Sequence, residues 1–266
     1  MYETLRVERE EHLTWLTFDR PDALNAMNRA FIREVRDFFW NLSEDRDTRV
    51  VVVRGAGRAF CAGLDLKEQG QGGDPGFGSV QGGLRSQREV IEIVMLMRRA
   101  PQAIIAAVHG PACGGGFAMA LAADVRIAGE SARMNAAFIR IGLSACDVGV
   151  SYFLPRMVGA SIAAELLLTG NFVDAARAEK IGLVSRVVPD ADLEATARAL
   201  AGDILRNSPL GVRLTKECLN MSLDAGSLEQ VIAMEDRNQI LCTRSEDFRE
   251  GVRAFLEKRP ASYRET

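Results

Sequence analysis

The fold is decided by residues 103–123, which read AIIAAVHGPACGGGFAMALAA. The first six residues are apolar without interruption, and a short apolar run of this kind is typical of a strand buried on both faces of a parallel sheet. Three consecutive glycines, Gly114 to Gly116, follow, and an apolar helix is predicted over residues 117–123. A buried strand that leads through a glycine-rich turn into a helix indicates a β-α-β unit, and hence the α/β class.

The same order of elements continues on both sides of this stretch. The valine-rich run of residues 49–54 predicts a second strand of the parallel sheet, and residues 124–128 predict a third. Amphipathic helices are predicted over residues 28–42 and 87–99, because apolar residues recur there at three- and four-residue steps. The other elements expected in this part are two strands and a glycine-rich loop, over residues 5–7, 13–18 and 69–83.

The chain changes character near residue 191, beyond which only helices are predicted. They are expected over residues 193–206, 210–223, 228–241 and 248–258. Thr243 and Glu246 have the spacing of a capping box, which predicts the start of the last helix. We therefore divide the chain into an α/β core, residues 1–190, and a helical C-terminal region, residues 191–266.

Charge and composition exclude several classes of protein. The 266 residues carry 33 Lys and Arg against 36 Asp and Glu, a net charge of −3, so no nucleic-acid or membrane partner is expected. There are only 2 His, and the 5 Cys include no C-x-x-C pair, so no metal site is expected. The N-terminus does not resemble a signal peptide and no apolar run approaches a membrane span. We therefore expect a cytoplasmic protein, or the mature form of an organellar one.

Two loops that follow predicted strands carry the candidate chemistry. In residues 60–67, FCAGLDLK, the backbone N–H of Gly63 or Leu64 is placed to point at a ligand, although a tight turn without function fits equally well. The glycines of the other loop allow close approach of a ligand, and the helix that follows begins with unpaired N–H donors. Together the loops predict a paired anion hole. Cys113 is a weaker candidate, a nucleophile near the helix N-terminus, because the spacing G-x-nucleophile-x-G is not met.

These loops, with two flanking motifs, resemble the crotonase (enoyl-CoA hydratase/isomerase) superfamily. The flanking motifs are Arg20-Pro21 with Leu24-Asn25-Ala26-Met27, and AFLEKR at residues 254–259. The resemblance runs in order across nearly the whole chain. It implies a spiral of ββα turns with a helical C-terminal trimerisation region, and a homotrimer or dimer of trimers. It also implies an acyl-CoA thioester as substrate, with coenzyme A as part of that substrate and no other cofactor.

The resemblance assigns roles to individual residues. Two backbone N–H groups of the family hold the thioester oxygen as it becomes an oxyanion, and by position these are the N–H groups of Leu64 and Gly115. Donors fixed in place before the charge develops contribute most where water is excluded. The residues expected by resemblance to contact the substrate or its coenzyme A are Leu24, Ala62, Asp65, Leu66, Lys67 and Lys258.

The sequence departs from the family's hydratases at both catalytic glutamates. The position three residues after the oxyanion-hole glycine is Ala118, and the second glutamate position falls on Phe138. Neither residue can transfer a proton. One carboxylate remains nearby, Asp147, and relatives with other activities place a functional Asp in this region. Asp147 is therefore the expected acid/base, although an Asp here also fits the N-cap of a helix running from Val148 toward Pro155.

The leading hypothesis is an enzyme of enoyl-CoA hydratase/isomerase type, a lyase or isomerase of acyl-CoA and fatty acid metabolism. With one acid, moving a double bond is chemically easier than a hydration that needs two groups. A second hypothesis is a CoA-thioester hydrolase or dehalogenase that uses Asp147. A third is a non-catalytic acyl-CoA-binding member of the family, which the missing glutamates suggest.

Overall fold

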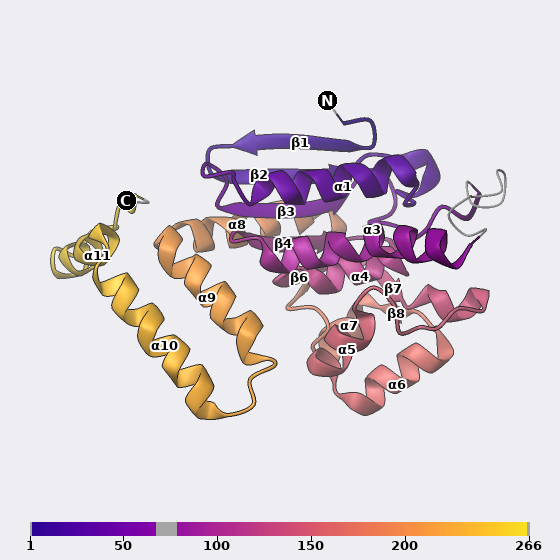
Figure 1. The fold of residues 1–266 in the computed structure, drawn as a ribbon. Coiled ribbons are helices and arrows are strands. Elements are labelled where there is room, and N and C mark those ends of the chain that lie inside the picture. Colours follow the sequence, from indigo (N-terminus) through magenta and orange to yellow (C-terminus); the bar gives the residue numbers. More distant parts are fainter. Residues whose placement is uncertain (1, 68–78, 265–266) are drawn as a thin grey trace.

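The computed structural model describes residues 2–67 and 79–264. Within these residues the central element is a six-stranded sheet in which β1 pairs antiparallel with β2 and every other neighbouring pair is parallel (Figure 1). In spatial order its strands are β1 (Leu5–Glu10), β2 (Leu13–Phe18), β3 (Val50–Gly55), β4 (Ala103–Val108), β6 (Val125–Gly129) and β9 (Val187–Val188). The parallel β3, β4 and β6 lie next to one another, which confirms the α/β class.

Side chains alternate between two apolar layers because successive residues of a strand point to opposite faces. Val51 and Val53 of β3 belong to the larger layer, which is covered by α1 (Arg29–Leu42) and α3 (Val80–Arg99). Val50 and Val52 belong to the smaller layer, which is covered by α8 (Leu193–Leu205). Both faces of the central strands are therefore buried, which is why these strands have continuous apolar sequences.

A second sheet of three short strands lies beside the first within the described residues. It consists of β5 (Pro111–Cys113), β7 (Arg133–Asn135) and β8 (Val173–Asp174). The sequence did not predict these strands, because two or three residues are too few to show a period. The segment that was expected to lead from the β4 strand directly into a helix thus contains β5 before α4 (Gly115–Ala122).

The C-terminal helices extend away from the sheet. The middle of the chain forms α5 (Val150–Val158), α6 (Ala160–Thr169) and α7 (Ala175–Lys180), and the end forms α9 (Pro209–Ser222), α10 (Leu228–Thr243) and α11 (Glu246–Leu256). In Figure 1, α10 and α11 project to the side opposite the start of α3. Because α8 packs against the sheet, the first helix of the C-terminal region shares a core with the strands. The division at residue 190 stays a prediction.

The side chain of the residue before a helix sets where α1, α3 and α11 begin. The starts of α3 and α11 differ from those predicted. Asn28 caps α1 as predicted, since its side chain accepts a hydrogen bond from the N–H of Phe31 at 2.8 Å. The predicted capping box at Thr243 is wrong, because the side chain of Ser245 caps α11 by accepting a hydrogen bond from the N–H of Phe248. The glycine-rich loop was predicted to extend to residue 83, but Ser79 caps α3 and residues 80–83 are helical. Residues 69–78 of that loop lie outside the described residues.

Among the helices that the structure describes, none combines the length and apolar character needed to cross a lipid bilayer.

Candidate active site

The loops after β3 and β4 are joined by backbone hydrogen bonds. The N–H of Cys61 donates to the carbonyl of Pro111 at 3.1 Å, and the N–H of Cys113 donates to the carbonyl of Cys61 at 2.9 Å. A third segment joins them, because the N–H of Met27 donates to the carbonyl of Gly63 at 2.7 Å. These bonds fix the loop that carries Leu64 against the segment that leads into α4.

Glycine is required where the two loops meet. Gly63 has φ +90°, and a Cβ added there would lie 2.7 Å from the carbonyl oxygen of Cys113 and 3.7 Å from the nitrogen of Gly115. A Cβ on Gly116 would lie 2.2 Å from the carbonyl oxygen of Cys61. Real side chains cannot be accommodated at such distances, so the small residues allow the backbones to touch. The result places the peptide groups of residues 63 and 115 side by side.

The N–H groups of Leu64 and Gly115 are available to a ligand. Within the described part of the chain, neither N–H has a hydrogen-bond acceptor. Gly115 is the first residue of α4, so its N–H is one of the donors that a helix leaves unpaired, and the positive end of the helix dipole lies there. The two N–H groups are therefore free to bind an acceptor, and the anion hole expected from the sequence stays a prediction.

Both residues line a cavity of about 780 Å³ that also contains Asp147 and Phe138. The cavity lies beyond the carboxyl ends of β3 and β4, which is where α/β proteins usually bind their ligands. Its walls include the facing sides of α1 and α3 and the segment of residues 137–148. The structure thus brings the two predicted N–H donors and the predicted acid/base into one cavity.

The carboxylate of Asp147 is held by one of its oxygens. Oδ1 accepts hydrogen bonds from the side-chain amide of Gln87 and from the N–H of Val148, the latter at 2.8 Å. Oδ2 has no partner among the described residues. Val148 has φ +47°, a strained conformation for a buried β-branched residue. The N-cap role considered for Asp147 is wrong, because α5 begins at Val150 with Gly149 at its N-cap.

The two positions that the resemblance assigns to the family's glutamates have different surroundings. Ala118 is fully buried in α4 and does not line the cavity. Phe138 does line it, and a Cβ on Gly114 would lie 3.5 Å from the Phe138 ring. Among the described residues the carboxylates lining the cavity are those of Asp147 and Glu89. Sequence reasoning missed Glu89 and Gln87, since nothing on α3 itself shows which residue faces residue 147.

The residues expected to bind coenzyme A do not all reach this cavity. Ala62 and Leu66 line it, and the carbonyl of Leu24 accepts the N–H of Ala62 at 3.0 Å. The carboxylate of Asp65 accepts hydrogen bonds from the guanidinium of Arg20 at 3.1 Å, which ties two loops together. Lys67 is exposed and lies outside the lining.

Lys258 is exposed just beyond α11. Figure 1 shows α11 on the opposite side of the molecule from the start of α3. It does not line the cavity of its own chain. Its expected contact with coenzyme A stays a prediction.

Cys113 is unsuited to act as a nucleophile. It lies in β5, and burial raises the pKa of its thiol to about 11. Burial likewise raises the pKa of Cys61 to about 12. Both thiols are therefore protonated at neutral pH, whereas a nucleophilic cysteine needs a thiolate.

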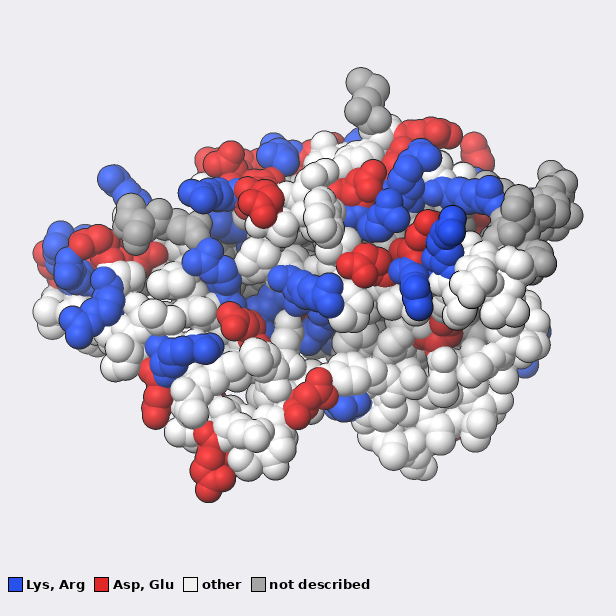
Figure 2. All heavy atoms as spheres, viewed as in Figure 1, with Lys and Arg blue, Asp and Glu red and all other residues white. Residues whose placement is uncertain are grey.

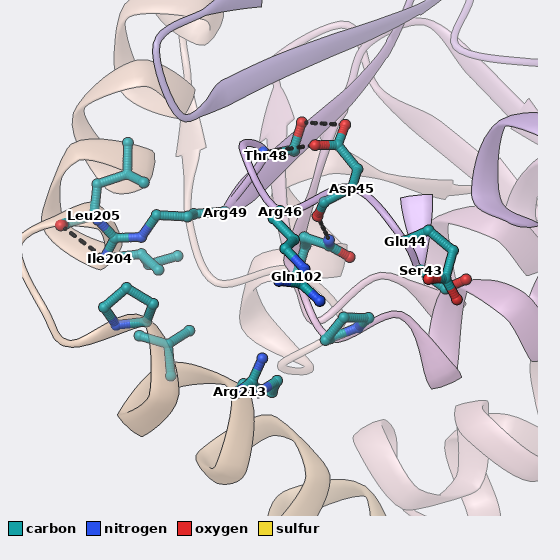
Figure 3. Close-up of a pocket in the computed structure, with 13 residues that line it drawn as sticks. Ser43, Glu44, Asp45, Arg46, Thr48, Arg49, Gln102, Ile204, Leu205 and Arg213 are labelled. Carbon is teal, nitrogen blue, oxygen red and sulfur yellow. Dashed lines mark hydrogen bonds between the residues drawn. The ribbon is translucent and has the colours of Figure 1, made fainter. Parts of the chain in front are cut away.

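A polar hollow of about 470 Å³ lies at the opposite, amino ends of β3 and β4 (Figure 3). The guanidinium of Arg49 there donates to the carbonyl of Leu205 at 3.1 Å, and Thr48 donates to Asp45. The side-chain amide of Gln102 donates to the carbonyls of Leu42 and Asp45. These contacts fasten the end of α8 and the turn before β3, so the hollow serves the fold.

Comparisons with known proteins identify the family. A family model described as enoyl-CoA hydratase/isomerase matches residues 8–266. The chain is 41% identical over 248 residues to a probable enoyl-CoA hydratase of Mycobacterium bovis, covering 92% of this chain and 86% of that protein. It is 34% identical over 263 residues to the 1,2-epoxyphenylacetyl-CoA isomerase of Escherichia coli, covering 99% of each.

A solved structure agrees with the sequence relatives. The crystal structure of a probable enoyl-CoA hydratase/isomerase from Mycobacterium abscessus has a TM-score of 0.89 at 38% identity, covering 98% of this chain and 99% of that one. The chain therefore belongs to the enoyl-CoA hydratase/isomerase family and has the crotonase fold. It is an acyl-CoA-processing enzyme of that family, which confirms the resemblance seen in the sequence.

Proposed function

We propose that the protein converts acyl-CoA thioesters through an enolate held by the N–H groups of Leu64 and Gly115, with Asp147 moving the proton. One observation carries the proposal: both N–H groups and the carboxylate line the same cavity. The family membership supports a CoA thioester as the substrate. The isomerase name of the Escherichia coli relative supports reactions other than hydration within the family.

The reaction that best fits one positioned carboxylate is movement of a double bond. Asp147 takes a proton from the carbon next to the thioester of a 3-enoyl chain, and the electron pair moves onto the thioester oxygen. The two N–H groups stabilise the resulting oxyanion, an effect typically worth about 10²–10³ in rate for each donor. Return of the proton to the far end of the double bond gives the 2-enoyl thioester, so no other reactant is needed.

The structure favours Asp147 over the other carboxylate of the cavity as the proton carrier. Two donors hold Oδ1 of Asp147 in place, and this leaves Oδ2 to face a substrate. Glu89 lies on an exposed turn of α3, and no hydrogen bond to its side chain is seen among the described residues. Because the side chains of Ala118 and Phe138 have no ionisable proton to transfer, a hydration that needs two glutamates is disfavoured.

The test compares Asp147→Asn with Glu89→Gln on a panel of 2-enoyl- and 3-enoyl-CoA esters, with products followed by mass spectrometry. We expect Asp147→Asn to lose at least about 10²-fold in turnover while still binding the esters, and Glu89→Gln to retain turnover. Unchanged turnover in Asp147→Asn would remove Asp147 from the mechanism. Release of free CoA in place of an isomer would instead support the hydrolase hypothesis, and binding without any turnover would support a non-catalytic role.

We also propose that the C-terminal helices join copies of the chain into a trimer, or a dimer of trimers. Large apolar side chains are exposed on α10 and α11, among them Leu228, Ile240 and Phe255, which are 74%, 60% and 82% exposed. Exposed apolar surface of this kind marks interaction sites in many proteins. Light scattering coupled to size-exclusion chromatography tests the proposal, and a monomeric mass would contradict it.

A further inference from the structure

The cavity that contains Asp147 is bordered by arginines from two helices. On α1 and on α3 the lining residues recur at three- and four-residue steps, so one stripe of each helix faces the cavity. Figure 2 shows basic side chains concentrated over α1 and the first turns of α3, with acidic ones between them. The lining residues of the two helices are Arg29, Ile32, Arg33 and Arg36 on α1, and Gly82, Arg85, Ser86, Gln87, Glu89 and Val90 on α3.

The arginines share their cavity with the proposed acid/base. Arg33 and Arg85 line the same cavity as Asp147 and Phe138. Of the residues expected to contact the substrate or its coenzyme A, Ala62 and Leu66 line this cavity, whereas the basic Lys67 and Lys258 do not. In the proposed function the thioester oxygen occupies the anion hole, so the acyl chain extends toward α1 and α3.

The walls of this region fit an acyl chain that ends in an anion. Ile32 and Val90 are half-buried apolar side chains that pack against the core, whereas Arg33 and Arg85 are exposed at the border. A guanidinium presents a planar fork of donors that matches a carboxylate in two parallel hydrogen bonds. Glu89 follows Arg85 by one helical turn, so the charge of Arg85 offsets its repulsion of an anion.

From this arrangement we infer that the substrate is a CoA thioester of a dicarboxylic acid, whose free carboxylate is bound by Arg33 and Arg85. The inference rests on the proposed function, because it places the thioester between Leu64 and Gly115. Arg36 strengthens the positive field, although it is within 3.6 Å of the carboxylate of Asp37. The chain between the two ends of the substrate contacts the apolar walls.

The test measures binding and does not require turnover. Dissociation constants are determined by titration calorimetry for glutaryl-CoA and valeryl-CoA, saturated esters of equal carbon number that differ in the terminal carboxylate, and for free coenzyme A. Adipyl-CoA and hexanoyl-CoA extend the comparison by one carbon. The proteins are the wild type, Arg33→Gln and Arg85→Gln. Arg88→Gln is the matched control, because Arg88 is an exposed arginine of α3 that does not line this cavity.

We expect the wild type and Arg88→Gln to bind at least one carboxylate-terminated ester about tenfold more tightly than its uncharged partner. Arg33→Gln and Arg85→Gln should lose that preference while binding valeryl-CoA and coenzyme A as the wild type does. Added salt should also reduce the preference, because these charges are near solvent.

Two results would overturn the inference. Equal wild-type affinities for both members of each pair would show that no terminal carboxylate is recognised. An equal loss of affinity for every ester and for coenzyme A in the arginine variants would show that these side chains hold the CoA phosphates. Failure of the proposed function is a separate result, because it appears as unchanged turnover in Asp147→Asn.

Discussion

The side-chain amide of Gln87 on α3 donates a hydrogen bond to Oδ1 of Asp147, a residue 60 positions later in the chain. The N–H of Val148 donates to the same oxygen at 2.8 Å. The carboxylate is thus held from two directions, by the neighbouring helix and by its own turn. This contact fixes the direction of Oδ2, which has no partner among the described residues.

Replacing Gln87 by Ala should lower turnover by about tenfold to a hundredfold, because the carboxylate loses a donor that orients it. Steady-state kinetics measures kcat and KM of both proteins. Gln81→Ala is the control, because Gln81 is an exposed glutamine of the same helix that does not line the cavity. An unchanged kcat in Gln87→Ala would contradict the orienting role of Gln87.

The effect of the close contact between the two loops at Gly63 can be separated from the cost of placing a side chain at a positive φ. Gly63→Ala should destabilise the fold by about 1–3 kcal/mol and reduce turnover by about 10²-fold or more, because the new methyl group pushes Leu64 away from Gly115. Gly182→Ala has a similar φ of +74° but only an ordinary contact at 3.8 Å, so it carries the conformational cost alone. Denaturant unfolding and kinetics of both variants separate the two contributions. Equal activity in the two variants would show that the close approach does not matter.

The side chain of Asn25 holds the start of the loop that carries Leu64. Its buried side chain accepts the N–H of Arg20 and donates to the carbonyls of Ala56 and Ala59. Asn25→Ala should cost about 2–4 kcal/mol of the free energy of unfolding, because these buried groups lose their partners. Asn28→Ala, which removes only the N-cap of α1, should cost about 1 kcal/mol. Urea unfolding of the two variants checks the ranking, and the reverse order would contradict it.

Buried thiols make the fold sensitive to alkali. Burial raises the pKa of Cys61 from 9.0 to about 12 and that of Cys113 from 9.0 to about 11. Because the folded pKa lies above the unfolded one, this contribution to stability is complete below pH 9.0 and is lost as pH rises toward 12. The free energy of unfolding should therefore fall by up to about 1.4 kcal/mol per pH unit for each thiol.

Cys61→Ala isolates one of these thiols. Its free energy of unfolding should fall less steeply between about pH 9 and about pH 10 than that of the wild type. Cys146→Ala removes an exposed cysteine and should leave the wild-type slope unchanged. Identical slopes in the wild type and in Cys61→Ala would contradict the prediction.

The sequence predicted those features that a few neighbouring residues determine. The strand of residues 103–108 was predicted at its observed bounds, because a continuous apolar run needs no information from elsewhere. The start of α1 was predicted because Asn28 is its own local signal. The three-residue β5 and residues 80–86 of α3 were missed, since pairing with a distant strand and the Ser79 cap overrode the local glycine-rich composition.

The sequence by itself determined the class of the fold, the family resemblance and the two positions, Ala118 and Phe138, that cannot transfer a proton. Only the tertiary structure decided that Gly63 and Gly115 lie side by side, that Gln87 holds Asp147, and that arginines of two helices border one cavity. The physical reason is the separation along the chain of the residues that interact. Strand and helix patterns arise from interactions within a few residues, whereas the site is made of contacts between residues far apart in the chain, which exist only once the sheet and its helices have packed.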